Sequence, residues 1–233
     1  MCEINQEDGG WRIGAAVPSA QMNEHAGLKA DWPGIVEGAD LIGSTQIQGR
    51  ATMAGNLCNA GPAADSVPAM VAAGAIVRVA GPSGSRDVPV EDIPTAPGKT
   101  SLAKGELVTS IFLPAKPPRS GSAYLRFIPR TEMDIAVVGV GITLTLDEAG
   151  TIAAASVALG AVGPKVIKAD TAAKTLIGTK GDESTLEKLA AAASAAATPI
   201  DDKRGTAEFR KDVTGVLARR TAKIALARAK GEA

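Results

Sequence analysis

The sequence is poor in the residues that metal centres and nucleophilic catalysis use most often. Among 233 residues it has two cysteines, Cys2 and Cys58, and one histidine, His25. No Cys-x-x-Cys pair occurs, which excludes a zinc ribbon and argues against an iron–sulfur cluster held by this chain alone. His25 lies in a polar segment and is expected at the surface. No metal site is predicted, and the few cysteines are typical of a reduced, cytoplasmic protein.

Net charge, aromatic residues and long hydrophobic runs are also scarce. Lysine plus arginine and aspartate plus glutamate both number 25, so the formal net charge is zero. This balance gives no electrostatic reason to expect nucleic acid or an anionic membrane as a partner. No apolar run approaches the roughly 20 residues that a membrane-spanning helix needs. The 45% of hydrophobic residues nevertheless allow a sizeable buried core.

Glycine and proline concentrate in the first 130 residues, whereas alanine, lysine and arginine dominate the last 65. This asymmetry predicts a loop-rich α/β region followed by helices. A capping box of Ser184 and Glu187 predicts one helix start. The last helix should begin near Thr206 and carry one apolar face formed by Phe209, Val213, Val216, Leu217 and Ile224. Alternating and apolar runs predict strands over 11–17, 75–80, 86–90, 107–113, 123–128, 135–146 and 151–159, and helices over 33–42, 68–75 and 168–177.

The segment ATMAGNLCNAGPAAD, residues 51–65, is the most informative part of the chain. Its small residues let the backbone approach a ligand closely, and exposed N–H groups there can bind an anion. Asn56, Asn59 and Asp65 supply polar side chains beside them. A structural turn would look much the same, and the segment has neither the Walker lysine nor the G-x-G-x-x-G spacing. Residues 44–68 show no periodicity, so we expect a long irregular stretch.

Residues 51–65 resemble the second flavin-binding loop of molybdenum hydroxylase flavoproteins, which usually reads near T-I-G-G-N-x-x-x-x-S-P-x-x-D. The likeness continues, in the same order, through APGKTSLAKGELVTSIFLP, SAYLRFIPRTEMDIAVVGV and PIDDKRGTAEFRKDV. It therefore covers nearly the whole chain. The sequence is similar to the FAD-binding subunits of the xanthine dehydrogenase and carbon monoxide dehydrogenase family.

The resemblance implies an α+β fold in two domains. Residues 1–118 would form an FAD-binding domain of the vanillyl-alcohol-oxidase (PCMH) type, and residues 119–230 a domain like the C-terminal domain of carbon monoxide dehydrogenase flavoproteins. The second domain would combine a three-stranded antiparallel sheet with helices. The family's first glycine loop is not found, because Gly9-Gly10 is followed by Trp11. We therefore expect the first subdomain to be absent, through truncation, a late start codon or an incomplete gene.

The resemblance also implies a set of FAD contacts. Residues 52–56 match the loop on the pyrophosphate, and Asp65 matches an acid on the flavin side. Arg126 matches a basic position where a positive charge could steady the reduced, anionic flavin. Leu102 matches a pocket-lining leucine, and Ile135 matches the residue packed over one face of the isoalloxazine ring. The predicted cofactor-binding residues are Ser44, Thr52, Met53, Ala54, Gly55, Asn56, Asp65, Leu102, Arg126 and Ile135.

Each of these residues also has a purely structural interpretation. Leu102 and Ile135 are suited to a core, and Arg126 to a surface ion pair of little energetic value. Asp65 could be the N-cap of the following helix, and Thr52 could bond its own backbone.

Two departures from the family pattern matter as well. Ala54 replaces a glycine, which requires a backbone conformation that alanine tolerates, and Gly61 replaces a serine hydroxyl.

The resemblance implies a subunit of an FAD-dependent oxidoreductase. It would pass electrons from iron–sulfur clusters of a partner subunit to NAD, a quinone or oxygen. The expected partners are a molybdopterin-binding large subunit and a 2Fe–2S small subunit, in a heterotrimer that dimerises. Two alternatives stay open: a non-catalytic remnant that only docks on partners, and a stand-alone flavin reductase of the enolpyruvyl-sugar type. Residues 122–140 argue against the second alternative.

Overall fold

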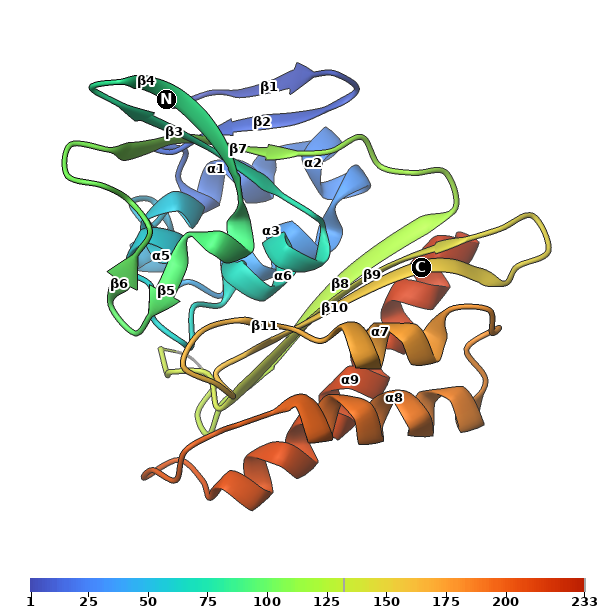
Figure 1. Cartoon of the computed structure of the whole chain (residues 1–233). Coiled ribbons are helices and arrows are strands. Elements are labelled where there is room, and N and C mark those ends of the chain that lie inside the picture. Colours follow the sequence, from blue (N-terminus) through green and yellow to red (C-terminus); the bar gives the residue numbers. More distant parts are fainter. Residues whose placement is uncertain (132, 233) are drawn as a thin grey trace.

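The computed structural model describes residues 1–131 and 133–232. The N-terminal part consists of a five-stranded antiparallel sheet, in the order β1-β2-β7-β3-β4, with short helices packed beneath it (Figure 1). Its strands are β1 (Ile4–Glu7), β2 (Gly10–Gly14), β3 (Ile76–Gly81), β4 (Gly84–Pro89) and β7 (Leu107–Leu113), with a separate small pair, β5 (Pro94–Ala96) and β6 (Lys99–Thr100). Its helices are α1 (Ser19–Glu24), α2 (Ala26–Asp31), α3 (Pro33–Asp40), α4 (Thr45–Gln48), α5 (Met53–Cys58) and α6 (Ser66–Ala72), with the 3-10 turn η1 (Val90–Asp92).

Strand β7 organises the first sheet because it pairs on both sides. Buried Ile111 lies opposite Ile13 of β2 on one side and Val77 of β3 on the other. The predicted strands over 75–80, 86–90 and 107–113 are confirmed as β3, β4 and β7, and β3 and β4 pair as a hairpin. Strand β1 was not expected, because its sequence is polar; its register with β2 places Gly9 in the connecting turn, at a φ of +74°.

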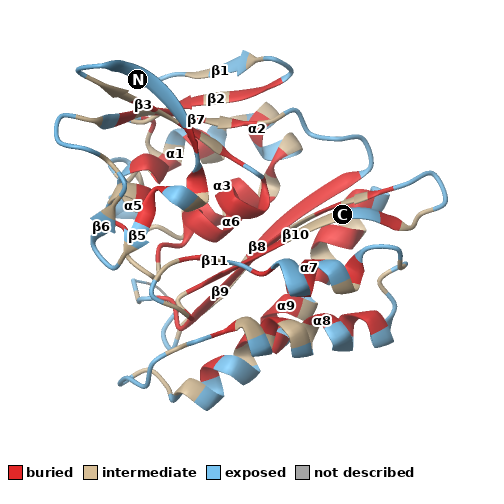
Figure 2. Ribbon diagram, in the orientation of Figure 1, coloured by how far each residue is buried: buried red, intermediate tan, exposed pale blue. Residues whose placement is uncertain are grey.

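The C-terminal part is a four-stranded antiparallel sheet covered by three helices on one face (Figure 1). The first part's α3 and α6 cover the other face, so the sheet is buried between two helical layers (Figure 2). The expected three strands are present, and the short β11 adds a fourth at the edge. The elements are β8 (Ser120–Phe127), β9 (Val138–Leu146), β10 (Ile152–Gly160), β11 (Ile167–Lys168), α7 (Asp170–Leu176), α8 (Glu183–Ala196) and α9 (Ala207–Lys230).

Glycines make the contact between the two parts possible. A Cβ at Gly141 on β9 would lie 2.5 Å from the carbonyl oxygen of Pro68 on α6. A Cβ at Gly34 on α3 would lie 2.8 Å from the backbone nitrogen of Ala123 on β8. All seven residues of α6 are buried, since this helix packs against β8, β9 and β10 of the second part and against α3, α5 and η1 of the first. Helices and sheet therefore meet backbone to backbone at this junction.

One expectation about the first part is wrong. Residues 44–68 are not one irregular stretch, because α4, α5 and the start of α6 lie within them. These helices are too short, at 4 to 7 residues, for a repeat of 3.6 to be visible. The predicted helix from Pro33 does begin there: Trp32 holds its N-cap position, and the Asp31 carboxylate next to it accepts a hydrogen bond from Trp11 Nε1 at 2.8 Å.

The predicted start of α8 is wrong, and the predicted apolar face of α9 is right only in part. Helix α8 is capped by Asp182, whose carboxylate accepts from the Thr185 amide at 2.8 Å, and not by Ser184. On α9, Leu217 is buried and Val213 and Ile224 pack against the core, but Phe209 and Val216 are 41% and 47% exposed. The buried face consists mainly of small residues and threonines, which allow close approach: a Cβ at Gly121 would lie 2.1 Å from the Ala225 carbonyl oxygen.

Candidate functional site

The segment that resembles a flavin loop folds into the start of α5. Thr52 is the N-cap: its backbone is extended, and its hydroxyl accepts from the Gly55 amide at 2.9 Å. The first amide groups of a helix have no intrahelical acceptor, so those of Met53 and Ala54 face outward along the helix axis. Ala54 lies within the helix and does not have a positive φ. Alanine therefore replaces the family glycine there without backbone strain, whereas the structural role of Thr52 is confirmed.

The end of α5 is tied to the start of α6 through one side chain. The Asn56 Oδ1 atom accepts from the backbone amide of Ser66 at 3.2 Å and from its hydroxyl at 2.8 Å. The turn between the two helices, residues 59–65, is thereby fixed at both ends. Ala60 in this turn has a φ of +50°, a strained conformation for a residue with a side chain.

Asp65 ends this turn and points to the second part of the molecule. It holds the N-cap position of α6 but makes no capping bond. Its Oδ1 accepts from the Tyr124 hydroxyl at 3.0 Å, and its Oδ2 pairs with Arg126 Nη1 at 2.7 Å. Arg126 donates also to the Leu41 carbonyl oxygen at 3.0 Å. The side chains of Arg126 and Asp65 are 7% and 10% exposed, so this ion pair is buried and the surface-pair interpretation of Arg126 is wrong.

Burial dominates the electrostatics of this cluster. It raises the pKa of Asp65 from 3.8 to about 6, although the charge of Arg126 and the hydrogen bonds from Tyr124 and Arg126 act in the opposite direction. Burial and the adjacent carboxylate both hold the pKa of Tyr124 well above its ordinary value. The Tyr124 hydroxyl therefore stays protonated and donates to Asp65.

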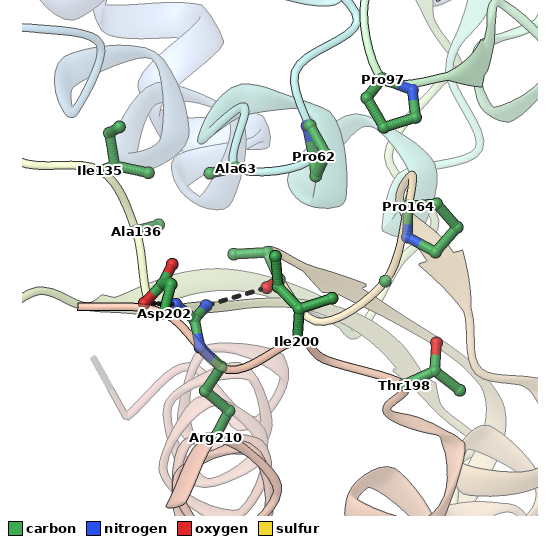
Figure 3. A pocket seen from close by; sticks show the side chains of 12 residues that line it. Pro62, Ala63, Pro97, Ile135, Ala136, Pro164, Thr198, Ile200, Asp202 and Arg210 are labelled. Carbon is green, nitrogen blue, oxygen red and sulfur yellow. Dashed lines mark hydrogen bonds and ion pairs between the residues drawn. The ribbon is translucent and has the colours of Figure 1, made fainter. Parts of the chain in front are cut away.

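A cavity of about 350 Å³ lies beside the same turn, at the junction of the two parts (Figure 3). Pro62 and Ala63 border it from the first part, and Ile135 and Ala136 border it from the second (Figure 3). The walls are mostly apolar. Ile135 is 56% exposed, so the expectation that it is a simple core residue is wrong.

Arg210 of α9 holds the floor of this cavity. Its Nη1 donates to the carbonyl oxygens of Val137 at 3.0 Å and Ala161 at 3.3 Å, and its Nη2 pairs with Asp202 at 2.6 Å. Ala161 has a φ of +64°, and its amide donates to Pro62 across the junction at 2.8 Å. One buried guanidinium therefore fixes the strained segment that joins both sides of the cavity.

The remaining predicted residues lie apart from the cavity lining. Ser44 is buried at the N-cap position of α4, and its hydroxyl donates to Gln46 Oε1 at 2.6 Å. Leu102 is half-buried and packs against the core of the first part. Cys58 is half-buried, and burial raises the pKa of its thiol, as befits a packed rather than a reactive cysteine.

Sequence reasoning missed Tyr124 and Arg210. A signal for Tyr124 existed, because it precedes Arg126 by two residues on a predicted strand, and such residues share one face. Arg210 gave no comparable signal, since a charged residue on an amphipathic helix is expected in solvent. Among residues 1–131 and 133–232, no three His, Cys, Asp or Glu side chains form a cluster that could hold a metal ion.

Comparisons with known proteins agree with this geometry. The family described as the FAD binding domain in molybdopterin dehydrogenase matches residues 1–116, and the CO dehydrogenase flavoprotein C-terminal domain matches residues 123–225. The carbon monoxide dehydrogenase medium chain of Afipia carboxidovorans is 35% identical over 92% of this chain and 75% of its own length. The xanthine dehydrogenase FAD-binding subunit of Escherichia coli O157:H7 is 30% identical over 97% of this chain and 77% of its own length.

Solved structures give the same result. Carbon monoxide dehydrogenase from Oligotropha carboxidovorans superposes with a TM-score of 0.92 at 33% identity, covering 97% of this chain and 78% of the other. The two matched domains together define a flavin-binding oxidoreductase subunit. The chain belongs to the FAD-binding subunits of the carbon monoxide dehydrogenase and xanthine dehydrogenase family, whose cofactor is FAD. None of the helices in the described ranges is both long and apolar enough to cross a membrane.

Proposed function

We propose that this chain is the electron-transfer subunit of a molybdenum hydroxylase, taking electrons from a partner's iron–sulfur clusters and delivering them to NAD, a quinone or oxygen. The observation that carries this proposal is the turn of residues 59–65. It lies between the end of α5, whose start is capped by Thr52, and the buried carboxylate of Asp65, and its Pro62 and Ala63 line the apolar cavity. A dinucleotide with a planar ring needs these three kinds of group together.

The residues present fit FAD. The free amides of Met53 and Ala54, with Gly55 and Thr52 beside them, suit the pyrophosphate, because the helix dipole favours negative charge there. Asp65 and the exposed side chain of Ile135 suit the flavin ring on the cavity side. FAD, when bound, supplies the conversion between single-electron and two-electron transfer. The chain's own residues orient the cofactor and keep water from one face of it.

Ser44, Leu102 and Arg126 have weaker support as direct contacts. The Arg126 guanidinium already donates to Asp65 and to the Leu41 carbonyl oxygen. Its effect on the cofactor would therefore be indirect, through the Asp65 carboxylate that it holds. We propose that Leu102 and Ser44 complete the cofactor surface rather than bind it strongly, because Leu102 packs against the core of the first part and the Ser44 hydroxyl already donates to Gln46.

The proposed partner subunits are inferred from the descriptions of the related proteins. One relative is the medium chain of a carbon monoxide dehydrogenase, a description that implies larger and smaller chains beside it. We therefore propose a molybdopterin-binding large subunit and a 2Fe–2S small subunit as partners, in a heterotrimer that dimerises. Both cysteines are free, which agrees with a reducing compartment such as the cytoplasm.

The test is the visible absorption spectrum of the purified chain after incubation with FAD and desalting. Retained flavin bands that are lost in Asp65→Ala, but kept in the control Asp212→Ala at an exposed site on α9, would support the proposal. A folded chain that retains no flavin would contradict it and favour the alternative of a docking module without a cofactor.

A further inference from the structure

We propose that Tyr124 is a positioning residue for FAD, which acts by holding the carboxylate of Asp65 in the orientation that the cofactor requires. This inference rests on the proposed function, because it takes Asp65 as a cofactor contact. Tyr124 is the only tyrosine in the sequence. It comes from β8 in the second part and reaches across the junction to a turn of the first part, 59 residues away along the chain.

The hydroxyl of Tyr124 occupies a position built for it. The residue is 2% exposed, and its hydroxyl donates to Asp65 Oδ1 at 3.0 Å. Gly139 of β9 makes room, since a Cβ there would lie 2.5 Å from the same hydroxyl. The backbone amide of Tyr124 donates to Glu37 Oε2 of α3 at 2.9 Å, which fixes the start of the side chain as well. Both ends of the tyrosine are therefore held against the first part.

Two donors on different oxygens fix a carboxylate more completely than one donor can. Tyr124 binds Oδ1 and Arg126 binds Oδ2, so the carboxylate cannot rotate about its last bond without losing one contact. Each oxygen can accept more than one hydrogen bond, so acceptor capacity remains for a ligand donor. Tyr124 and Arg126 lie two residues apart on β8 and thus share one face of the strand.

The arrangement is more than the fold itself needs. An aspartate at an N-cap position ordinarily accepts from the amides of its own helix. Asp65 makes no such bond: the Val67 amide donates to the Ala64 carbonyl oxygen at 3.3 Å, and Pro68 at the next position has no N–H. The Asp65 carboxylate is thereby free of helix capping and is instead held from the second part, beside the turn that borders the cavity. A carboxylate held in one orientation in this way is suited to binding a ligand.

The experiment is a double-mutant cycle on FAD affinity. The dissociation constant is measured by quenching of flavin fluorescence for the wild-type chain, Tyr124→Phe, Asp65→Ala and the double variant, and the visible circular dichroism of bound flavin is recorded for each. Tyr124→Phe should weaken FAD binding about tenfold, the effect of losing one hydrogen bond to a charged group, and should alter the flavin dichroism. In the Asp65→Ala background the same substitution should change the affinity less than about twofold.

Thr143→Val is the matched control. It removes a buried hydroxyl from the adjacent strand β9, and the Thr143 Oγ1 atom has no partner among the described residues. Its FAD affinity and dichroism should equal those of the wild type. Thermal unfolding without FAD checks that every variant is folded.

The outcomes separate this inference from the proposed function. A wild-type chain that binds no FAD, or an Asp65→Ala variant with unchanged affinity, would overturn the assignment of the cofactor site and this inference with it. If the wild type binds FAD and Asp65→Ala weakens it, an equal loss from Tyr124→Phe in both backgrounds would overturn the inference alone. Unchanged affinity and dichroism in Tyr124→Phe would do so too.

Discussion

The two parts of the molecule differ in the length of their helices and in what holds those helices in place. The first part carries the segment that resembles a flavin loop on helices of 4 to 7 residues, which are too short to be stable by themselves. The second part has a 14-residue and a 24-residue helix packed on an antiparallel sheet. The residues that fix the first part's loop, Tyr124 and Arg126, come from the second part. The lesson is that this segment is placed by contacts with the second part more than by its own helices.

The same contrast separates α6 from α9. Helix α6 is buried along its whole length, because it packs against the second sheet and against α3, α5 and η1, whereas α9 buries one face and exposes Phe209 and Val216 on another. A helix that is apolar all round needs cover on both sides. Because α6 is held in place by this packing, the turn of residues 59–65 that leads into it is held in place too.

The largest expected effect comes from breaking the support of the cavity floor. Arg210→Met should lower the free energy of unfolding by about 4 kcal/mol, because two buried carbonyl oxygens, of Val137 and Ala161, lose their donor. Urea unfolding monitored by circular dichroism measures this change. Arg220→Met, at an exposed position of the same helix, should change stability by less than about 0.5 kcal/mol. Similar effects of both substitutions would show that the α9 framework does not depend on Arg210.

The next effect sharpens the role of the buried carboxylate. The pKa of Asp65, raised to about 6 by burial, lies above the ordinary value of 3.8, so the folded state binds this proton more tightly than the unfolded state. The contribution of Asp65 to stability is therefore full below about pH 4 and is lost as the pH rises through about 6. Its total size is about 3 kcal/mol at most.

Urea unfolding at a series of pH values tests this sign. The wild-type free energy of unfolding should fall, relative to Asp65→Asn, between about pH 4 and pH 6. The exposed-site variant Asp212→Asn should run parallel to the wild type across that window. A wild-type curve that instead rises relative to Asp65→Asn would mean that the Arg126 charge outweighs burial.

A smaller effect tests the close contact between the two parts. Gly141→Ala places a Cβ against the Pro68 carbonyl and should cost about 2 kcal/mol, because neither backbone can move away easily. Gly49→Ala is the control, since no atom lies within 4 Å of the added Cβ there. Differential scanning calorimetry would show the difference in Tm. An unchanged Tm in Gly141→Ala would mean that the junction yields at low cost.

The smallest effect separates two possible caps of α8. Asp182→Ala should lower stability by about 1 kcal/mol through loss of the bond to the Thr185 amide. Ser184→Ala should change the free energy of unfolding by only a few tenths of a kcal/mol, because Ser184 already lies inside the helix. A larger loss in Ser184→Ala would restore the capping box that the sequence pattern predicts.

Local patterns in the sequence determined a large share of this fold. Alternating and apolar runs predicted strands β3, β4 and β7 and the three long strands of the second sheet. These runs are visible in the sequence because side chains along a strand point alternately to its two faces. Thr206 marked the start of α9, where its hydroxyl accepts from the Phe209 amide. The likeness of residues 51–65 to a flavin loop, together with three later blocks, indicated the family and FAD. The division at residue 118 and the individual cofactor contacts stay predictions.

Only the tertiary structure decided which groups meet. Asp65 lies 59 residues from Tyr124 and 61 from Arg126, and nothing local distinguishes a carboxylate that caps its helix from one that crosses to another sheet. The buried face of α9 was likewise decided by packing, because the sheet accepts small residues and threonines more closely than Phe209 or Val216. Periodicity in a sequence reports only on neighbours within one element. The partner of a buried charge depends on burial and distance, which arise when distant elements pack together.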